Sequence, residues 1–591
     1  MSQQTEQVED SSDSVGSVLD SFEDWYHVPV LAAALSFMLW VRLQSYDKFT
    51  RNGEILFDGN DAWYHLRQVQ YTVNNWPSTM PYDPWTYFPF GTSVGQFGTL
   101  YDQLIATAAL VVGLGEPSQQ TIATTLLVAP AVFGTLVAIP TYLVGKRLGG
   151  RPGGLFGVLV LALFPGTFLR RGLVGFADHN IAEPLFQAFA VLAMMVALTV
   201  AEREKPVYEL LADRDFEALR RPFGYSILAG IATAFYLWTW PPGVLLVGIF
   251  GAFFGLKLTA DYVRGVSPDH LAFVGAISMT VTGLLLLVPL GTFDFSPTKF
   301  SPLQPLLAFA VAFGCVFMAW LARQWEARDL STALYPATVG GIIAAVVGVV
   351  YVALPSLYSL VSNNLVRIIG FSTGAKTRTI GEAQPFLSNT NSQYGIAWYD
   401  LIIQEYGLML FTAVLAAVWM LWRTYRSDDH RAEYLLVLVW AAFITAAAFT
   451  QVRFNYYLAV PVAVLNAYLV GQVISVVKFP SFRNVGDING TQVFAVLFVV
   501  LLVVPVLVMP ANLGTARYPD TRTAMESGGA AGPGDITKWQ GSLNWMENST
   551  PAEGDYGNAN NADQLDYYGT FDQQNSDYDY PEGAYGVMSW W

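Results

Sequence analysis

The sequence is poor in cysteine, in charge and in basic residues. It has 591 residues with one cysteine, Cys315, and only 13% are charged, well under the roughly 25% typical of soluble domains. A single cysteine excludes an intrachain disulfide and a thiolate metal site, and its apolar surroundings indicate a buried, inert thiol. Lys and Arg number 31 against 46 Asp and Glu, so a basic nucleic-acid footprint is absent and we expect no nucleic-acid partner.

The acidic residues are concentrated at the two ends of the chain. The first 25 residues contain seven Asp or Glu and no Lys or Arg, and the tail from Ala511 contains twelve acids against three bases. These polar ends fit a protein bathed in high salt, and ordinary disordered ends are the alternative. A cleavable signal peptide is not predicted, so the first apolar segment would act as its own insertion signal.

Long apolar segments dominate the rest of the chain, which is 53% hydrophobic overall. Runs of about 18 or more apolar residues indicate membrane-spanning helices. We therefore predict an all-α polytopic membrane protein. The candidate segments are 28–45, 98–115, 119–145, 153–169, 184–202, 224–240, 242–263, 270–291, 304–323, 333–355, 406–424, 433–450, 455–477 and 491–510.

The distribution of Lys and Arg decides which segments cross. Basic clusters fall in alternate connections, as the positive-inside rule requires, only if one early segment does not cross. Segment 98–115 is the weakest because it contains Asp102 and Gln103, so we interpret it as a helix lying against the membrane. The result is thirteen crossings, with the N-terminus cytoplasmic and the C-terminus external. The predicted long external connections are 46–118, 170–183 and 356–405.

This topology implies three regions. Residues 1–25 form an acidic cytoplasmic tail, and residues 26–511 form the transmembrane domain that carries the external loops. Residues 512–591 are expected to begin an external C-terminal globular domain. Both of the longest external loops exceed what a connector needs, which indicates function.

Three short polar motifs lie at the ends of predicted spans. They are Gly59–Asp61, Asp178–Asn180 and Thr379–Glu382, and the predicted topology places all three on the external side. Acids at such positions are unfavourable in a membrane and are usually functional. Because Mg²⁺ and Mn²⁺ prefer carboxylate and carbonyl oxygens, the motifs suggest a metal-dependent site that works on something membrane-bound.

Each motif also has a purely structural interpretation. Asp61 and Asp178 precede helical runs, where an Asp side chain can cap the first backbone N–H groups. A cap can also be a metal ligand, so the two interpretations are compatible. Glu382 lies in a long loop, where a solvated surface acid is common, and it gains interest only beside the other two motifs.

Five further side chains are candidates for binding. His179, like His65, lies in an external motif and is either structural or a contact for metal or phosphate. Arg453 lies in a short external turn, where its guanidinium suits a phosphate at the membrane surface, although it could simply snorkel to the interface. Trp240 ends an external span and is either part of the aromatic belt or a donor-site residue. Trp590 and Trp591 end a polar tail and expose large apolar faces.

Together these residues resemble the catalytic subunit of oligosaccharyltransferase in its single-subunit archaeal form. The matching features, in order along essentially the whole chain, are Asp61, Asp178–Asn180, Thr379–Glu382, Arg453 and Trp590–Trp591. The last pair begins the family's Trp-Trp-Asp-Tyr-Gly signature. Any one motif is weak, whereas all five in this order are specific, and the acidic composition suggests a haloarchaeal member.

The resemblance implies a fold, an activity and partners. The fold would be that of a GT-C type glycosyltransferase with about thirteen transmembrane helices. The activity would be metal-dependent transfer of a glycan from a dolichol phosphate-linked donor to the Asn of an Asn-X-Ser/Thr sequon. The partners would be the lipid-linked oligosaccharide, the acceptor protein and membrane lipid. The enzyme would act as a single subunit in the cell membrane, with its active site on the extracellular face.

The resemblance also implies roles for individual residues. Asp61, Asp178 and Asn180 would hold Mn²⁺ or Mg²⁺, and Asp61 and Glu382 would be catalytic. An amide nitrogen is a poor nucleophile because its lone pair is delocalised, and carboxylates accepting its N–H groups would hold it in a less conjugated state. The remaining assignments are His179, Arg453 and Trp240 for the donor phosphate, and Glu382, Trp590 and Trp591 for the acceptor sequon.

Two departures from the family pattern stand out. The third position of the second motif is the neutral Asn180, where the family usually has Asp, Glu or His, so its metal role is open. The signature stops at Trp591, so we expect the chain to be a fragment with little or no activity alone.

Two other functions remain compatible with parts of the pattern. One is another polytopic glycosyltransferase that uses a lipid-phosphate sugar, which would need neither Glu382 nor the two terminal tryptophans. The other is a secondary transporter, which predicts acids near mid-span and broken helices. Here the acids lie at span ends.

Overall fold

The computed structural model describes most of the chain as helix. The described residues are 25–86, 91–202, 210, 213–214, 216–291, 293–371, 381–387, 398–426, 431–477, 490–508 and 522–549. The chain divides into two compact units, and each is described separately. The first comprises Met1–Ser45, Ala129–Val174 and His179–Ala531, and the second comprises Tyr46–Val128, Gly175–Asp178 and Gly532–Trp591.

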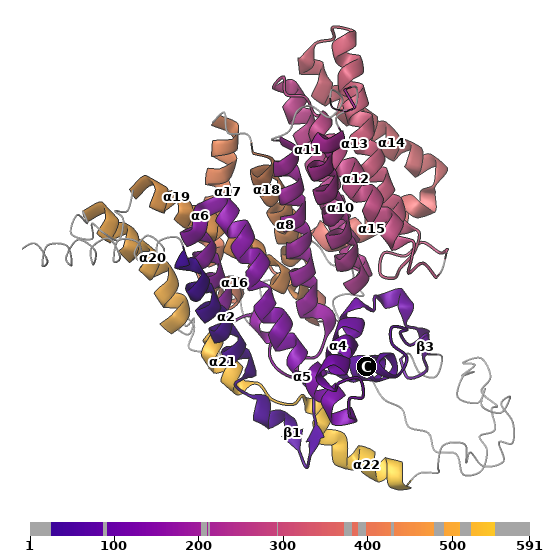
Figure 1. Ribbon diagram of the computed structural model, residues 1–591, viewed down its shortest axis with the longest axis vertical. Coiled ribbons are helices and arrows are strands. Elements are labelled where there is room, and N and C mark those ends of the chain that lie inside the picture. Colours follow the sequence, from indigo (N-terminus) through magenta and orange to yellow (C-terminus); the bar gives the residue numbers. More distant parts are fainter. Residues whose placement is uncertain are drawn as a thin grey trace, which may run out of the picture. The chain divides into compact units, whose positions relative to one another are not determined.

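The first unit is a bundle of long apolar helices, many of which run side by side (Figure 1). Their sequences are apolar on most sides, as expected for helices surrounded by lipid and by other helices. The helices are α2 (His27–Leu43), α6 (Ala138–Leu163), α7 (Thr167–Arg171), α8 (Ala182–Glu202), α10 (Phe216–Thr239), α11 (Leu245–Val263), α12 (Asp269–Leu286), α13 (Leu303–Ala327), α14 (Tyr335–Ala353), α15 (Pro355–Ile369), α16 (Trp398–Tyr406), α17 (Met409–Arg426), α18 (Ala432–Thr450), α19 (Asn455–Val477), α20 (Gly490–Val508) and α21 (Ala524–Ala530).

Small residues bring two of these helices into close contact. Gly145, Gly149, Gly153 and Gly157 of α6 recur every four residues and face α19, where a Cβ on Gly157 would lie 3.1 Å from the carbonyl oxygen of Ala463. Such small-residue spacing lets helix backbones approach closely in membranes. The close packing of α6 on α19 therefore depends on glycine, which has no side chain, at these four positions.

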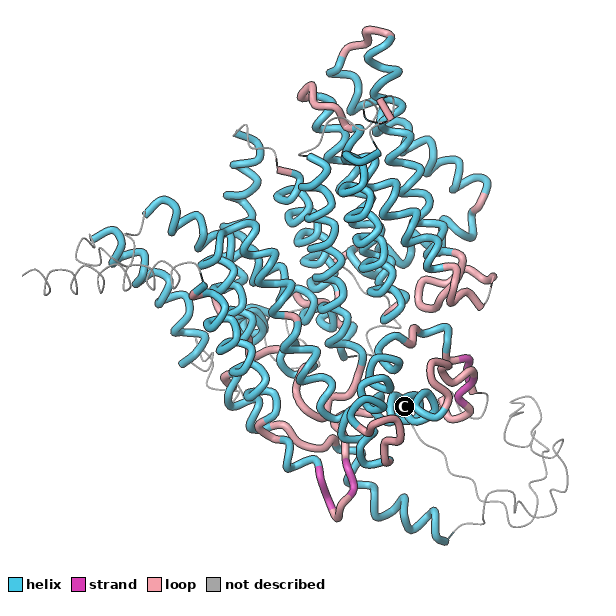
Figure 2. Tube along the Cα trace, viewed as in Figure 1, coloured by secondary structure: helices cyan, strands magenta, loops and turns pink. Residues whose placement is uncertain are grey.

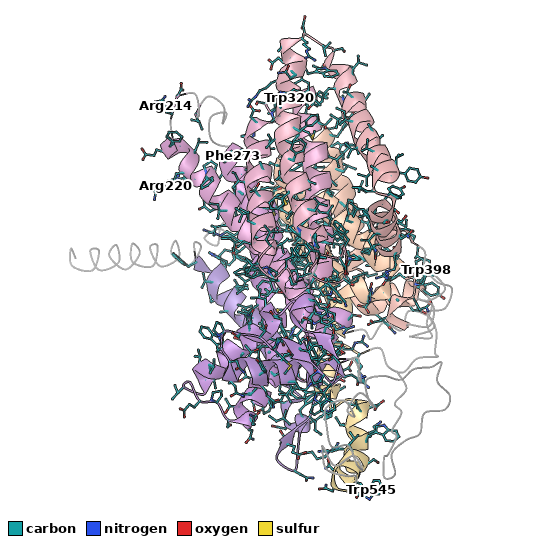
Figure 3. All side chains as sticks on the ribbon, turned by 90° about the vertical axis from the view of Figure 1, so that its right-hand side faces the viewer. Arg214, Arg220, Phe273, Trp320, Trp398 and Trp545 are labelled. Atoms are coloured by element: carbon teal, nitrogen blue, oxygen red, sulfur yellow. The ribbon has the colours of Figure 1, made fainter. Side chains whose placement is uncertain are left out.

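Large apolar side chains also lie on the outside of the bundle. Trp320 of α13, labelled in Figure 3, is 51% exposed. Several residues of α14 and α17 are more exposed still, including Val352 at 77% and Leu415 at 64%. Water-soluble monomers rarely expose large contiguous apolar surfaces, so these faces are suited to lipid.

The second unit contains shorter elements. Its helices are α3 (Asp61–Asn74), α4 (Leu100–Val112) and α22 (Gln540–Ser549), and α5 (Gln119–Leu136) runs from this unit into the first. The strands form two short antiparallel pairs (Figure 2), β1 (Thr50–Arg51) with β2 (Glu54–Ile55) and β3 (Tyr82–Asp83) with β4 (Thr92–Ser93). In these pairs Thr50 lies opposite Ile55 and Tyr82 lies opposite Ser93.

The described helices bear out a multi-pass membrane protein. Among the described residues, nine helical segments are long and apolar enough to cross, or ten if the bent pair α16–α17 forms one span. One of the nine is the 45-residue segment Gln119–Leu163, which is interrupted at Gly150 by a left-handed φ of 73°. At 1.5 Å per residue this segment is about twice the thickness of a bilayer core of about 30 Å, so it is long enough for two crossings.

The number of thirteen crossings stays a prediction. Helix α4 matches the excluded segment 98–115, and its 13 residues are too few for an ordinary crossing. Helix α10 does not count among the nine spans, and its first two turns carry Glu217, Arg220 and Arg221. Helix α15, in the predicted loop 356–405, has polar residues on one side and is not among the candidate spans.

Candidate functional site

The first motif lies at the start of α3. Asp61 is the first residue of this helix, and Asn60 occupies the N-cap position without a side-chain cap hydrogen bond. Asp61 is exposed, whereas His65 is buried. Residues four apart lie on the same face of a helix, so Asp61 and His65 share one face of α3.

His65 lies between two carboxylates of the second unit. Its Nδ1 is 2.7 Å from Oδ1 of Asp102, and its Nε2 is 3.6 Å from Oδ1 of Asp178. All three side chains are buried. Burial alone would lower the pKa of His65, but the two carboxylates outweigh it and raise that pKa to about 10. A protonated His65 is thus the positive partner of two buried acids.

The donor chemistry around the second motif fits a divalent cation. Asp178 supplies a carboxylate, and His179, the next residue along the chain, supplies an imidazole. Imidazole suits zinc and similar transition metals, while carboxylate and amide oxygens suit Mg²⁺ and Mn²⁺. Because Asp61 shares the face of His65, its carboxylate would add an oxygen ligand and favour the harder ions.

The third motif is held against a late turn of the first unit. Glu382 lies in the short 3₁₀ helix η7 (Gly381–Ala383), and Arg453 lies in η8 (Val452–Phe454). The backbone N–H of Val452 donates to the carbonyl of Gln384 at 3.0 Å, which ties the two turns together. This backbone bond explains how residues far apart in sequence come to share one place.

Glu382 is paired with two arginines. Its Oε2 accepts a hydrogen bond from Arg171 at 3.2 Å, and its Oε1 is 4.0 Å from Nη1 of Arg453. The Glu382 side chain is 42% exposed, so it remains accessible. Arg171 ends α7, whose first residue, Thr167, donates through its backbone N–H and its hydroxyl to the buried Glu405.

The end of the second motif contacts a buried polar network of the same unit. His179 and Asn180 lie in η3 (His179–Ile181), directly before α8. The hydroxyl of Tyr456 is 3.0 Å from Oδ1 of Asn180 and 2.9 Å from Oε2 of Glu183. Oε1 of Glu183 is 3.3 Å from Nε2 of His179.

Of the other candidates, the structure describes Trp240. Trp240 packs its ring against Phe454 and Tyr457, with centroids 6.4 and 6.0 Å away, so it lies near the turn that carries Arg453. Four predicted residues lie outside the described ones and receive no structural account; they are Thr379, Ile380, Trp590 and Trp591.

Sequence reasoning missed four residues of this region. Asp102 was used only to weaken a candidate span, and Glu183, Arg171 and Tyr456 were given no role. A signal was present for the two acids, because an acid within an apolar helical run needs a buried partner. Nothing local marks Arg171 or Tyr456, since their partners lie hundreds of residues away.

Comparisons with known proteins agree with the resemblance. Residues 30–511 match the profile of the family "Oligosaccharyl transferase STT3, N-terminal". The dolichyl-monophosphooligosaccharide–protein glycotransferase AglB of Haloferax volcanii is 53% identical over 636 residues, which covers 97% of this chain and 60% of that protein. The chain thus spans about three fifths of the length of this relative.

Two solved structures from Archaeoglobus fulgidus share the fold. The oligosaccharyltransferase AglB with an inhibitory peptide and a dolichol-phosphate has a TM-score of 0.76 at 23% identity, covering 96% of this chain and 62% of that one. The oligosaccharyltransferase with Zn and sulfate has a TM-score of 0.67 at 21% identity, covering 95% and 58%. With its first four motifs in order and a match that covers most of its length, the chain belongs to the oligosaccharyl transferase STT3 family.

Proposed function

We propose that the chain is the membrane-embedded catalytic part of an oligosaccharyltransferase. It would transfer a glycan from a dolichol phosphate-linked donor to the Asn of an Asn-X-Ser/Thr sequon. The observation that carries this proposal is the pairing of Glu382 with Arg171 and Arg453, because it joins the third motif to charged residues up to 211 positions away in sequence. An accessible acid beside two cations suits a reaction between a neutral amide and a phosphate-linked sugar.

The acids would act on the acceptor amide. Carboxylates of Asp61 and Glu382 would accept its two N–H groups and hold the nitrogen in a less conjugated, more nucleophilic state. Glu382 is exposed enough to receive such a ligand. Release of Glu382 from Arg171 and Arg453 would then accompany binding of acceptor and donor.

The basic and aromatic groups would act on the donor. Arg453 would bind the carrier phosphate through its guanidinium fork. His179 would be a second contact for the phosphate, and Trp240 packs against Phe454 of the turn that carries Arg453. Asp61, Asp178 and Asn180 would hold Mn²⁺ or Mg²⁺, with His179 as a further nitrogen ligand. When bound, the cation supplies Lewis-acid stabilisation to the departing phosphate.

The proposal also covers the residues that bind the acceptor sequon and the orientation of the chain in the membrane. Trp590 and Trp591 would donate to and pack on the sequon hydroxyl, so a peptide without that hydroxyl would leave buried donors unpaired. The motifs would face the outside of the cell membrane, with the N-terminus cytoplasmic and the C-terminus external.

The decisive experiment is a transfer assay. The full-length protein is incubated with a sequon peptide, a lipid-linked glycan and Mn²⁺ or Mg²⁺. We expect a glycopeptide, its loss with EDTA, and a fall in rate of at least about a hundredfold in Asp61→Ala and Glu382→Ala. The measurement is the shift of a fluorescent peptide on a gel.

Two controls make the assay specific. Asp535 is 91% exposed, and Asp535→Ala should retain the parent rate. A peptide with Ala in place of the sequon Ser or Thr should not be glycosylated. Equal transfer to that peptide, or full activity in the presence of EDTA, contradicts the proposal.

A further inference from the structure

Glu183 is a fully buried acid that the proposed reaction does not use. It lies in the first turn of α8, four residues after His179, and its side chain accepts hydrogen bonds from Tyr456 and Tyr457. It is 0% exposed. A buried carboxylate is unfavourable unless it is hydrogen-bonded, and such groups in membrane proteins are usually functional.

The hydrogen bonds that lead to Glu183 have only one possible direction. Trp440 has a donor only, so Oε1 of Gln187 accepts from it at 3.0 Å and Nε2 of Gln187 donates to Tyr236 at 3.1 Å. The hydroxyl of Tyr236 therefore gives its single proton to Tyr457, 3.1 Å away. Tyr457 in turn gives its proton to Glu183. Glu183 is the final acceptor of this chain.

The hydroxyl of Tyr456 has a single proton to donate and lies near two possible acceptors. Its oxygen is 2.9 Å from Oε2 of Glu183 and 3.0 Å from Oδ1 of Asn180. The carboxylate is the stronger acceptor, so the proton goes to Glu183 and the hydroxyl has only lone pairs left for Asn180. A half-turn of the Asn180 amide satisfies this arrangement, because Nδ2 then donates to Tyr456 and Oδ1 points the other way.

We propose that Glu183, acting through Tyr456, is a positioning residue that turns the amide oxygen of Asn180 toward the cation of the second motif. The inference rests on the proposed function and deepens it. An Asp at this position offers an oxygen in either orientation, whereas Asn does so in only one. The fixed hydrogen-bond direction therefore compensates for the neutral residue at the third position of the motif.

The same carboxylate also faces His179. Oε1 of Glu183 is 3.3 Å from Nε2 of this ring. A metal-binding histidine usually has one ring nitrogen hydrogen-bonded to a carboxylate, which leaves the other ring nitrogen for the ion. In this geometry Nδ1 of His179 is the nitrogen that faces away from Glu183. Glu183 thus contacts His179 directly and is connected to Asn180 through Tyr456.

Neighbouring tyrosines provide a matched test. Tyr456 and Tyr457 stack on each other with ring centroids 4.6 Å apart, and both donate to Oε2 of Glu183, but of the two the structure pairs Tyr456 with Asn180. Mn²⁺ affinity is measured on the purified chain by the loss of the free-ion EPR signal. We expect Tyr456→Phe and Glu183→Gln to bind about tenfold more weakly than the parent chain, and Tyr457→Phe to stay within about threefold.

A second background separates positioning from general packing. In Asn180→Asp either side-chain oxygen can face the ion, so adding Tyr456→Phe should change the affinity by less than about twofold. Unchanged affinity in Tyr456→Phe, equal losses in the two tyrosine variants, or a full loss in the Asp background would each overturn the inference. The measurement uses no glycan and no peptide, so it succeeds or fails independently of the transfer assay.

Discussion

At the scale of single residues, buried polar groups show which positions matter. His65 and Asp102 form one such pair, in which the imidazole lies between Asp102 and Asp178. The raised pKa of His65 indicates that it carries a positive charge at neutral pH. Without that charge, the two acids would face each other in a buried place, where like charges repel strongly.

His65→Gln tests this arrangement. Glutamine keeps a donor but loses the charge, so the free energy of unfolding should fall by about 3 kcal/mol, as for other broken buried pairs. The measurement is the midpoint of thermal unfolding in detergent. Asn74→Ala, at an exposed position on the same helix, is the control and should leave the midpoint unchanged. Equal midpoints for both variants would show that the charge of His65 does not stabilise the fold.

At the scale of elements, close helix contacts depend on glycine. Helix α6 changes direction at Gly150, whose φ of 73° is accessible chiefly to glycine. On either side of this break Gly149 and Gly153 lie against the carbonyl group of Ala467 on α19. A methyl group at either position would have to displace backbone, which cannot move as freely as the end of a side chain.

Gly153→Ala should therefore destabilise the bundle, by about 1–3 kcal/mol. Gly248→Ala on α11 is the matched control, because a Cβ there meets no atom within 4 Å. At that open position Ala should stabilise the helix by up to about 1 kcal/mol. Thermal unfolding of the two variants should shift in opposite directions, and a shift in the same direction would contradict the close contact of α6 with α19.

At the scale of the whole molecule, charge separates the ends from the membrane part. The first 25 residues carry a net charge of −7 and the tail from Ala511 carries −9, against −15 for the whole chain, so the segment between them is close to neutral. Orientation in the membrane then depends on where the few Lys and Arg lie between spans. The predicted orientation places residues 292–303 outside and residues 324–332 inside the cell.

Cysteine labelling of intact cells tests this orientation across one helix. Thr298 and Ser331 flank α13 at opposite ends and both are exposed. Cys315 is buried and should stay silent. An impermeant maleimide should label Thr298→Cys directly and Ser331→Cys only after the membrane is opened. The reverse pattern would invert the topology, and labelling of both in intact cells would exclude a crossing by α13.

The membrane fold and the family could be predicted from the sequence because both depend on local patterns. Apolar runs predict helices, and the exclusion of residues 98–115 followed from the distribution of Lys and Arg and from Asp102 and Gln103 within that segment. The site could be predicted only as a set of motifs. Asp61 and Asp178 were found before helical runs, and Glu382 and Arg453 in an external loop and an external turn. No local pattern predicted the pairing of Arg171 with Glu382.

The sequence by itself determined the class of protein, the order of its helices and the residue types available for chemistry. These follow from composition and short-range spacing, which act within a few turns of chain. The tertiary structure alone decided which side chains meet. It placed His65 between Asp102 and Asp178, and Tyr456 between Asn180 and Glu183. Hydrogen bonds need partners within about 3 Å, and only folding brings residues separated by hundreds of positions so close.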